Sequence, residues 1–490
     1  MLLRNKTKKI LCFSVLAIFL ISSASALETK ESSYEDDIDP LVNLEITVDI
    51  KEIRALDKID IFDDPDFYLK IYVNDIEYIS DVWPDQKYVE PSWSISQDVP
   101  DEQEFVNIKI QLWDQNRYND KLCDISSSSD KDVELVYSLK TGHWTGDDFV
   151  GSNDFSGYGW LNGCDDGTIY KRDRDCELWF DIYQNDYDGD GIPYWTEVNE
   201  YGTNPEVDDT GRDDDNDDVP IEWEYKWDYN PFVFNNHGSL DPDDDGLDNF
   251  EEYLTSDLGS DPFRRDILLE LDQMEIGPNG EGSSIPELTK DLLIDAYSKY
   301  NIMLYINNDG ERIPFDSTTT GGELQNIYLR YFLDNNPNNW KRGVFHYGLV
   351  IYHSSNHPGF VFESEINGIE LLDCFQVSTK YHDTLPGRSP FYNFLRYKSF
   401  NLEYKRAVVY AGAMMHETGH VLGINHWNTP GCDTDSGFPG GSEWYKYRNY
   451  KSCMNYNYVY TLIDYSDGSR GENDFNDWER IDLTRFQRRW

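Results

Sequence analysis

The chain has 490 residues, of which 93 are acidic and 42 are Lys or Arg, so its formal net charge is −51. This charge excludes a general nucleic-acid binder, because it would repel the phosphates of DNA or RNA. It favours bound cations, a high-salt habitat, or both. A chain of this length is expected to form two or three domains.

The first 26 residues have the pattern of a secretory signal peptide. Four basic residues precede a mostly apolar run at 10–21, and small residues at 22–26 offer a cleavage site after Ala26. The apolar run is short for a membrane span, although an uncleaved anchor remains an alternative. Removing four basic residues from −51 leaves a mature charge of −55. We expect a secreted protein that is extracellular or attached to the cell surface.

Cysteine usage agrees with export. Six cysteines follow the signal segment: Cys123, Cys164, Cys176, Cys374, Cys432 and Cys453. An even number in an exported chain predicts disulfides. Cys164 with Cys176 would staple a hairpin, and Cys432 with Cys453 would tie two loops near the C-terminus, although sequence alone leaves the pairing open.

Residues 27–183 are predicted to form an all-β sandwich. Apolar and polar residues alternate at 44–50, 68–73 and 106–112, and turn residues separate these runs. The stretches at 55–71 and 113–120 resemble the first and third calcium loops of the phospholipid-binding sandwich of protein kinase C and synaptotagmin.

That resemblance implies a set of candidate calcium ligands in the sandwich. They are Asp57, Asp66, Asp114, Asn116 and Asp120, with Asp124 competing for the last place. A solvated acidic face is the alternative in so acidic a chain. The resemblance also leaves two roles open for calcium, which are membrane or cell-surface association and simple stiffening of the loops.

Residues 184–262 contain an acidic repeat. Three loops carry acids at positions 1, 3, 5 and 12, the EF-hand-type calcium pattern: Asp186, Asp188, Asp190 and Glu197; Asp213, Asp215, Asp217 and Glu224; and Asp241, Asp243, Asp245 and Glu252. Position 6 is glycine in the first and third loops but Asp218 in the second, so the second loop departs from the pattern.

These repeats resemble thrombospondin type 3 repeats, which are acidic spacers filled with calcium. The resemblance implies a calcium-binding spacer between two folded domains. An acidic linker is the alternative, but it does not account for a glutamate at position 12 in all three loops. Without cations, carboxylates at this density would repel one another.

Residues 263–490 show mixed α/β patterning. Strands are predicted at 267–271, 302–306 and 346–352, and helices at 286–300 and 323–333. The apolar stretch at 407–415 predicts a helix through the centre of the domain, and it leads directly into a histidine-rich motif.

That motif is HETGHVLGINH at 416–426. Residues four apart share one face of a helix, so His416 and His420 can bind one zinc ion, with Glu417 beside them as the general base. Gly423 can end the helix in a left-handed conformation and turn the chain back, which makes His426 the third expected ligand.

The motif resembles the long zinc signature of the metzincin metallopeptidases, HExxHxxGxxH. Ser452-Cys453-Met454-Asn455-Tyr456 resembles the methionine turn of that family. The resemblance implies that residues 263–490 form an α/β metzincin-like catalytic domain with a twisted mixed sheet. It also implies that Met454 is the apolar floor under the zinc and that Tyr456 stabilises the oxyanion, for which a packing role is the alternative.

Together the patterns predict a multidomain protein with Zn²⁺ and Ca²⁺ as cofactors. We expect a secreted zinc-dependent endopeptidase that hydrolyses protein or peptide substrates with a zinc-activated water. The alternative is a calcium-stiffened cell-surface or adhesion protein with an inactive protease domain. Glu417, the histidines and the methionine turn are all retained, which favours the enzyme.

Overall fold

The structure is a computed structural model. It describes residues 38–60, 63–148, 159–307, 312–355, 357, 359–361, 364–366, 369–371, 373–387, 400–434 and 441–486. The signal peptide predicted at 1–26 lies outside these residues. Within the described chain, no helix combines the length and apolarity that crossing a bilayer requires.

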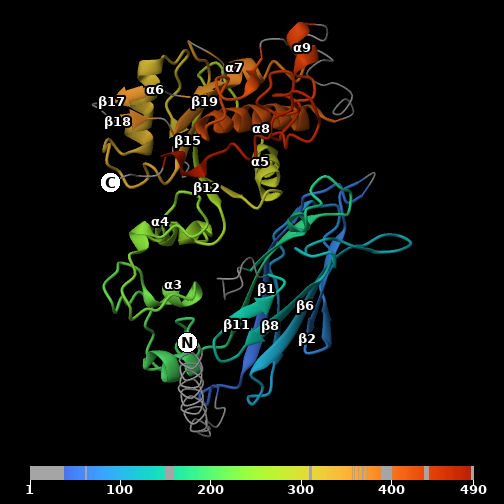
Figure 1. Cartoon of the computed structure of the whole chain (residues 1–490), viewed down its shortest axis with the longest axis vertical. Coiled ribbons are helices and arrows are strands. Elements are labelled where there is room, and N and C mark those ends of the chain that lie inside the picture. The colour runs from blue at the N-terminus through green and yellow to red at the C-terminus, as the bar shows by residue number, and fades with distance from the viewer. Residues whose placement is uncertain are drawn as a thin grey trace, which may run out of the picture.

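The first part of the chain is a sandwich of two antiparallel sheets (Figure 1). One sheet has the order β10-β11-β1-β4, with β5 also paired to β1. Its strands are β1 (Glu45–Ala55), β4 (Tyr88–Val89), β5 (Trp93–Asp98), β10 (Trp160–Asn162) and β11 (Cys176–Gln184). The other sheet has the order β3-β2-β6-β8-β9, with β7 paired to β6. Its strands are β2 (Phe67–Val73), β3 (Ile76–Ile79), β6 (Phe105–Asp114), β7 (Lys121–Leu122), β8 (Val133–Ser138) and β9 (Trp144–Gly146).

The core of the sandwich follows from the alternation in its longest strands. In β1, Ile46, Val48 and Ile50 are buried while the residues between them are more exposed. In β6, alternate residues from Val106 to Leu112 are buried in the same way. Successive side chains of a strand point to opposite faces, so each strand contributes one apolar face to a shared core. The predicted all-β module is therefore confirmed as a β-sandwich.

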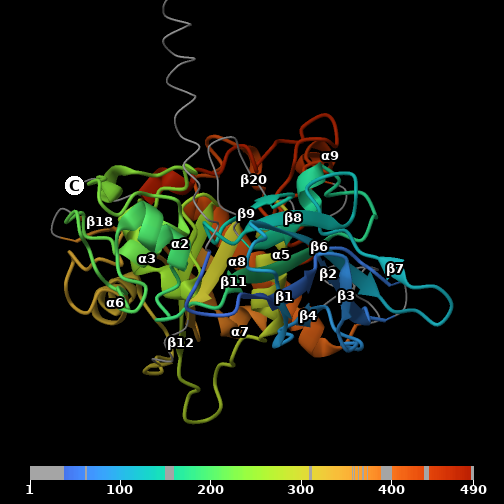
Figure 2. The same cartoon turned by 90° about the horizontal axis from the view of Figure 1, so that it is seen from below.

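Next comes a spacer of three loop-and-helix units that lies beside the sandwich in both views (Figures 1 and 2). Its elements are α2 (Tyr194–Thr196) continued by the π-helix η2 (Glu197–Tyr201), α3 (Ile221–Lys226), the 3₁₀ turn η3 (His237–Ser239), α4 (Asn249–Leu254) and η4 (Ser256–Leu258). Its apolar contacts are small clusters around Ile192, Val219 and Trp223. So little apolar burial leaves the acidic loops as the main feature of the spacer.

The last part is built on a mixed sheet with the order β13-β12-β15-β19-β16, and β14 also pairs with β12. The strands are parallel except β16, which runs antiparallel to β19 at the end of the sheet. Their bounds are β12 (Asp266–Met274), β13 (Met303–Asn307), β14 (Arg312–Ile313), β15 (His346–Ile351), β16 (Gly359–Val361) and β19 (Cys374–Ser378); β17 (Ser364–Ile366) and β18 (Ile369–Leu371) form a separate hairpin.

Helices cover both faces of this sheet. The helix α5 (Leu288–Ser298) and the long α8 (Leu402–Val421) share one apolar core with the sheet. On the opposite face lies α6 (Gly321–Ile327), which continues as the π-helix η5 (Tyr328–Phe332). Shorter elements complete the domain: α7 (Thr379–His382), β20 (Pro430–Asp433), α9 (Ser442–Lys446) and η6 (Leu483–Phe486). The strands and helices predicted here from 267 to 333 are confirmed within a few residues.

The three parts contact one another through polar groups. Arg54 of β1 reaches Asp295 of α5 at 3.2 Å, and Tyr88 donates a hydrogen bond to the same carboxylate at 2.7 Å. The sandwich meets the spacer where the His143 ring stacks on Tyr225, with centroids 4.8 Å apart. The sandwich therefore supports both the spacer and the α/β part.

Candidate metal centres

The helix α8 carries the first centre. Asn401 caps its N-terminus by accepting a hydrogen bond from the Tyr404 backbone N–H at 2.8 Å. His416 and His420 lie one turn apart near its C-terminal end, on one face, as the spacing predicts. Gly423 follows with φ +100°, the left-handed conformation expected of a glycine that ends a helix.

The rings of the two histidines are nearly perpendicular, at 84°, with centroids 4.6 Å apart. The His416 Nδ1–H donates to the Cys453 carbonyl at 2.9 Å, and the His420 Nδ1–H donates to the Ile424 carbonyl at 2.7 Å. These bonds turn both Nε2 atoms inward, where they lie 3.1 Å apart. Backbone acceptors of this kind orient metal-ligating histidines in many proteins.

Asp433, at the end of β20, is the third member of this group. Its Oδ1 lies 3.3 Å from His416 Nε2 and 3.3 Å from His420 Nε2. Three electron-rich atoms at these distances require a positive charge among them, which is either a proton or a metal ion. Zinc bonds of about 2.0–2.1 Å produce tetrahedral edges of about 3.3 Å, so the set fits zinc.

Sequence reasoning missed Asp433. It is one of 93 acids, and it has no fixed spacing from the helix. Tertiary contacts place it, because its backbone N–H donates to the Met454 carbonyl at 3.0 Å and its φ is +53°. The sequence offered one weak indication of this candidate ligand, which is that Asp433 lies seven residues after the end of the motif and directly follows Gly431-Cys432.

The other residues predicted for this centre lie around the same group. His426 is at its rim, with Nδ1 4.0 Å from Asp433 Oδ2 and 66% of its side chain exposed. Glu417 is buried beside the two histidines. The Tyr456 ring lies 5.3 Å from the His416 ring, and the tyrosine is half-exposed.

Met454 lies beneath the helix, fully buried. A Cβ added at Gly419 would overlap the Met454 sulfur, so the helix can approach the methionine only because position 419 has no side chain. The neighbouring Cys453 carbonyl holds His416. The turn at 452–456 therefore packs against α8 at the two histidines, and its role beneath a metal stays a prediction.

Electrostatics at the centre favour a cation. Burial would raise the pKa of Asp433, but the imidazoles of His416 and His420 beside it hold that pKa well below its usual range. Burial would lower the pKa of His420, but Asp433 and then Glu417 raise it to about 9. The pKa of Glu417 is raised, chiefly because the carboxylate is buried.

The three spacer loops share one pattern of backbone hydrogen bonds. The position 1 carboxylate accepts from the position 6 N–H, and the position 5 carboxylate accepts from the position 7 N–H. The bonds are Gly191 to Asp186 at 2.8 Å, Asp218 to Asp213 at 3.2 Å and Gly246 to Asp241 at 3.1 Å, then Ile192 to Asp190 at 2.8 Å, Val219 to Asp217 at 3.2 Å and Leu247 to Asp245 at 2.7 Å. Asp218 has φ +74°, so the second loop keeps the conformation that glycine gives the other two.

Carboxylate oxygens converge inside these loops. The position 12 glutamates, Glu197, Glu224 and Glu252, are all buried. Within the described chain, oxygens of these three residues and of Asp188, Asp215 and Asp243 are buried and have no hydrogen-bond partner. Such atoms cost free energy unless a cation binds them. Burial, followed by the acids of the same loop, raises the pKa of Glu197 to about 8.

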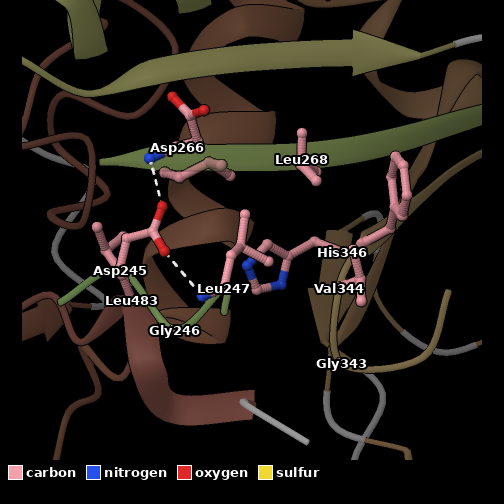
Figure 3. A pocket seen from close by; sticks show the side chains of 11 residues that line it. Asp245, Gly246, Leu247, Asp266, Leu268, Gly343, Val344, His346 and Leu483 are labelled. Atoms are coloured by element: carbon pink, nitrogen blue, oxygen red, sulfur yellow. Dashed lines mark hydrogen bonds between the residues drawn. The ribbon is translucent and has the colours of Figure 1, made fainter. Parts of the chain in front are cut away.

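The third loop also holds the start of the α/β sheet (Figure 3). Asp245 accepts hydrogen bonds from the Leu247 and Asp266 backbone N–H groups at 2.7 and 2.6 Å. Asp266 is the first residue of β12. Position 5 of the loop therefore joins the spacer directly to the sheet.

The acids predicted as calcium ligands in the sandwich fall into two groups. Asp114 accepts hydrogen bonds from the Asp66 N–H at 3.1 Å and the Asn116 amide at 2.6 Å, and Asp120 accepts from the Asn116 N–H at 2.9 Å. Lys121 Nζ lies 3.4 Å from Asp114, which supplies one positive charge to this group.

Asp57 belongs to the second group, with Asp173 and Asp175. The sequence did not indicate Asp173 or Asp175, since they lie more than a hundred residues beyond Asp57. Asp175 is buried, and burial together with Asp173 and Asp57 raises its pKa to about 8. Asp124, the alternative to Asp120, instead accepts a hydrogen bond from Lys131 at 2.9 Å.

The predicted disulfides are not formed. All six described cysteines are buried free thiols. Cys176 faces Cys123 rather than Cys164, because a bridge between Asp124 and Asp175 brings those two backbones together. Cys164 instead donates to Asp175 Oδ2, with sulfur and oxygen 3.7 Å apart. Cys432 and Cys453 are neighbours near the C-terminal end of α8 but remain unbonded.

No protein-family model and no curated protein matches the chain. Solved structures with a C2-like β-sandwich do match. They include a C2 domain at 12% identity, over 28% of this chain and 97% of that one, with a TM-score of 0.19. A C2 domain of plant extended synaptotagmin 1 matches at 15% identity, over 29% and 98%, with a TM-score of 0.18. Human GIVD cytosolic phospholipase A2 matches at 11% identity, over 31% of this chain but only 17% of the phospholipase, with a TM-score of 0.19.

Proposed function

We propose that the chain is a secreted zinc-dependent endopeptidase whose active site lies at the C-terminal end of α8. The observation that carries the proposal is the pair of Nε2 atoms 3.1 Å apart, each ring held by a backbone carbonyl, next to the buried Glu417. Two inward-facing imidazoles with an adjacent carboxylate are the donor set of a hydrolytic zinc site.

The third ligand is either His426 or Asp433. A catalytic zinc has three protein ligands and leaves its fourth coordination position for water or substrate. His426 and Asp433 therefore cannot both bind the zinc together with His416 and His420. We propose His426, because imidazole suits zinc and the turn at Gly423 delivers this histidine to within 4.0 Å of Asp433. In that arrangement Asp433 remains close to both other imidazoles and adds negative charge beside them.

Zinc would supply Lewis-acid polarisation of the scissile carbonyl and a more acidic water. Glu417 accepts the proton of the attacking water and passes it to the leaving amine, so that the amide C–N bond breaks while a C–O bond forms. Its raised pKa makes it a stronger base than an ordinary carboxylate. In this proposal Tyr456 donates a hydrogen bond to the carbonyl oxygen as negative charge develops there.

An extended peptide is the substrate class that the surroundings of Glu417 favour. The backbone of β16 passes so close that a Cβ at Gly359 would overlap the Glu417 carboxylate. Among the described strands, β16 pairs only with β19, so its other edge faces the centre without a strand partner. A strand edge of this kind binds an extended peptide by backbone hydrogen bonds.

The test is proteolysis by the purified chain. We expect it to cut a mixture of unfolded proteins in calcium, to lose this activity with a zinc chelator, and to regain it when zinc is restored. The matched control is Glu417→Gln, which should bind zinc without cutting. A zinc-loaded chain that cuts no substrate would favour the alternative, a calcium-stiffened adhesion protein with an inactive protease domain.

The first and third spacer loops are proposed to bind calcium through Asp186, Asp188, Asp190 and Glu197, and through Asp241, Asp243, Asp245 and Glu252. Their oxygen-only donors suit a hard cation. The middle loop shares their backbone conformation, but His237 adds a nitrogen to its donors. Calcium in the sandwich loops is proposed at Asp66, Asp114, Asn116 and Asp120, with Asp57 in the separate group.

Membrane association through the sandwich is a second candidate function. Tyr118, in the loop between Asp114 and Asp120, is 87% exposed, and an aromatic side chain beside a cation loop can enter a lipid interface. Sedimentation with anionic vesicles, with and without calcium, tests this. A Tyr118→Ser variant that sediments as well as the wild type would exclude this loop.

A further inference from the structure

The middle spacer loop differs from its neighbours through His237. This residue begins η3, thirteen residues after Glu224, and it is 1% exposed. Its Nε2 lies 3.2 Å from Asp217 Oδ2 and 3.6 Å from Glu224 Oε1, and the three side chains are between 99% and 100% buried. Positions 5 and 12 of the loop thus share a buried space with an imidazole nitrogen.

Two of these three candidate ligand atoms lack a hydrogen-bond partner within the described chain. In the part of the chain that the structure describes, His237 Nε2 and Glu224 Oε1 are buried and form no hydrogen bond. Both are directed into the space that they share with Asp217. Buried polar atoms without partners are few in folded proteins, and a bound ion is one of the explanations for them. The three atoms are also spaced about as far apart as neighbouring ligands of a small divalent cation.

Surrounding residues hold the imidazole in place. Asn249 Nδ2 lies 3.1 Å from Nδ1, and within the described chain Asn249 Oδ1 forms no hydrogen bond. Turning this amide by 180° places Oδ1 at Nδ1, so that the Nδ1–H donates to it and the Nε2 lone pair faces the carboxylates. The Trp223 and Tyr229 rings meet the imidazole edge-on, with centroids 5.6 and 5.0 Å away. A second hydrogen bond on the other ring nitrogen and tight packing are the support that a metal-binding histidine receives.

In the first and third loops, an oxygen-bearing side chain lies beside the position 12 glutamate, where the middle loop has His237. In the first loop the Thr203 hydroxyl donates to Glu197 at 3.0 Å. In the third loop the carboxylate of Asp266 lies near those of Glu252 and Asp245. Calcium prefers oxygen ligands, whereas imidazole suits zinc and other first-row transition cations.

We propose that the middle loop is a mixed nitrogen–oxygen site for a divalent transition cation of the zinc class, bound by Asp217, Glu224 and His237. The spacer then has two kinds of site, with oxygen-only loops on either side of a histidine-containing one. The proposal does not depend on the peptidase, because the site lies in a different part of the chain.

The test counts zinc bound by the full chain. Protein is equilibrated with micromolar Zn²⁺ in millimolar Ca²⁺, which fills the oxygen-only loops, and its zinc is then measured by elemental analysis. A His420→Ala chain removes the zinc expected at α8, so any tightly bound zinc that remains reports the spacer. We expect one zinc ion in this chain and none after His237→Gln is added. His143→Gln, which replaces a half-buried histidine packed against the spacer, is the matched control and should lose none.

A second variant guards against misfolding. His237→Glu puts an oxygen ligand where the wild type has a nitrogen. We expect this variant to lose the zinc and to bind one more calcium ion. It should keep the protease resistance of the wild-type spacer. A His420→Ala chain that binds no zinc would overturn the proposal without any change at position 237. Zinc that survives His237→Gln would overturn it as well, and would show that the imidazole is only an ion-pair partner of Asp217 and Glu224.

Discussion

Asp245 Oδ2 accepts a hydrogen bond from the Asp266 backbone N–H at 2.6 Å, so a carboxylate of the third acidic loop holds the first residue of β12. Asp266 is itself buried, and Asp243 and Glu252 lie near it. Four carboxylates in so small a volume repel one another unless cations are bound. Arg264, 3.3 Å from Asp266, offsets part of this repulsion, and the calcium proposed for the loop would offset the rest and so link the stability of the sheet to its binding.

Calcium removal should loosen the spacer and the sheet together. A cation that binds only the folded state adds about 2.7 kcal/mol per site at a hundredfold excess over its Kd, and chelation removes this term. We expect cleavage by an added protease within 184–262 in chelator and protection in millimolar calcium. High monovalent salt is the control for general charge screening. The same cleavage pattern with and without calcium would reduce the loops to a charged linker.

Glu417→Gln should abolish turnover and leave the metal in place. The amide keeps the size of the side chain but cannot accept a proton, and general-base catalysis is worth about 10²–10⁴-fold. The measurement is kcat and zinc content on the same sample. Glu403→Gln, on the exposed first turn of the same helix, is the control and should keep the wild-type rate. A rate near wild type in Glu417→Gln would require another base.

His426→Ala and Asp433→Asn separate the two candidates for the third zinc ligand. We expect His426→Ala to lose most of the bound zinc, and Asp433→Asn to keep it with altered affinity, because the carboxylate contributes charge rather than a bond. Removing a supporting group typically weakens metal binding by about 10–100-fold. Competition with a chromophoric chelator measures both variants. If Asp433→Asn lost most of its zinc and His426→Ala kept it, Asp433 would be the third zinc ligand.

Tyr456→Phe should slow catalysis without disturbing the metal. Loss of one hydrogen bond to the developing oxyanion costs about 10²–10³-fold in kcat, and a partly exposed donor is expected at or below the lower end of that range. Tyr458→Phe, two residues further along the same turn, is the control. Its hydroxyl donates to the Arg448 carbonyl at 2.7 Å, away from the histidines. Equal rates for both variants would make Tyr456 a packing residue.

Gly419→Ala should destabilise the domain, since the new methyl group would overlap the Met454 sulfur. Overpacking of a buried contact costs about 1–3 kcal/mol. Gly322→Ala in α6 is the matched control, because a Cβ there meets open space and alanine favours the helix. Chemical denaturation of both variants provides the comparison. A Gly419→Ala variant with the free energy of unfolding of the wild type would show that Met454 can move aside.

Local sequence determined much of this protein. The alternation of apolar and polar residues in β1 and β6 predicted the sandwich. Successive side chains of a strand point to opposite faces, so this alternation marks a strand with one buried face. The spacing of His416 and His420 predicted two rings on one helical face, since the period of the helix is a local property. The positions of the acids predicted three EF-hand-type loops, and the second loop, which departs from the pattern at Asp218, has the backbone hydrogen bonds of the other two in the structure. These features depend only on neighbours in the chain.

Only the tertiary structure decided which distant groups meet. Asp433 joins the two histidines because its backbone bonds to Met454, and Asp173 and Asp175 join Asp57 because β11 pairs with β1. Cys176 faces Cys123 for a similar reason, which spacing along the chain could not reveal. His237 enters the middle loop from outside the repeat pattern. Such contacts depend on the folding of long intervening segments, so the chemistry of each centre was completed by residues that no local pattern marks.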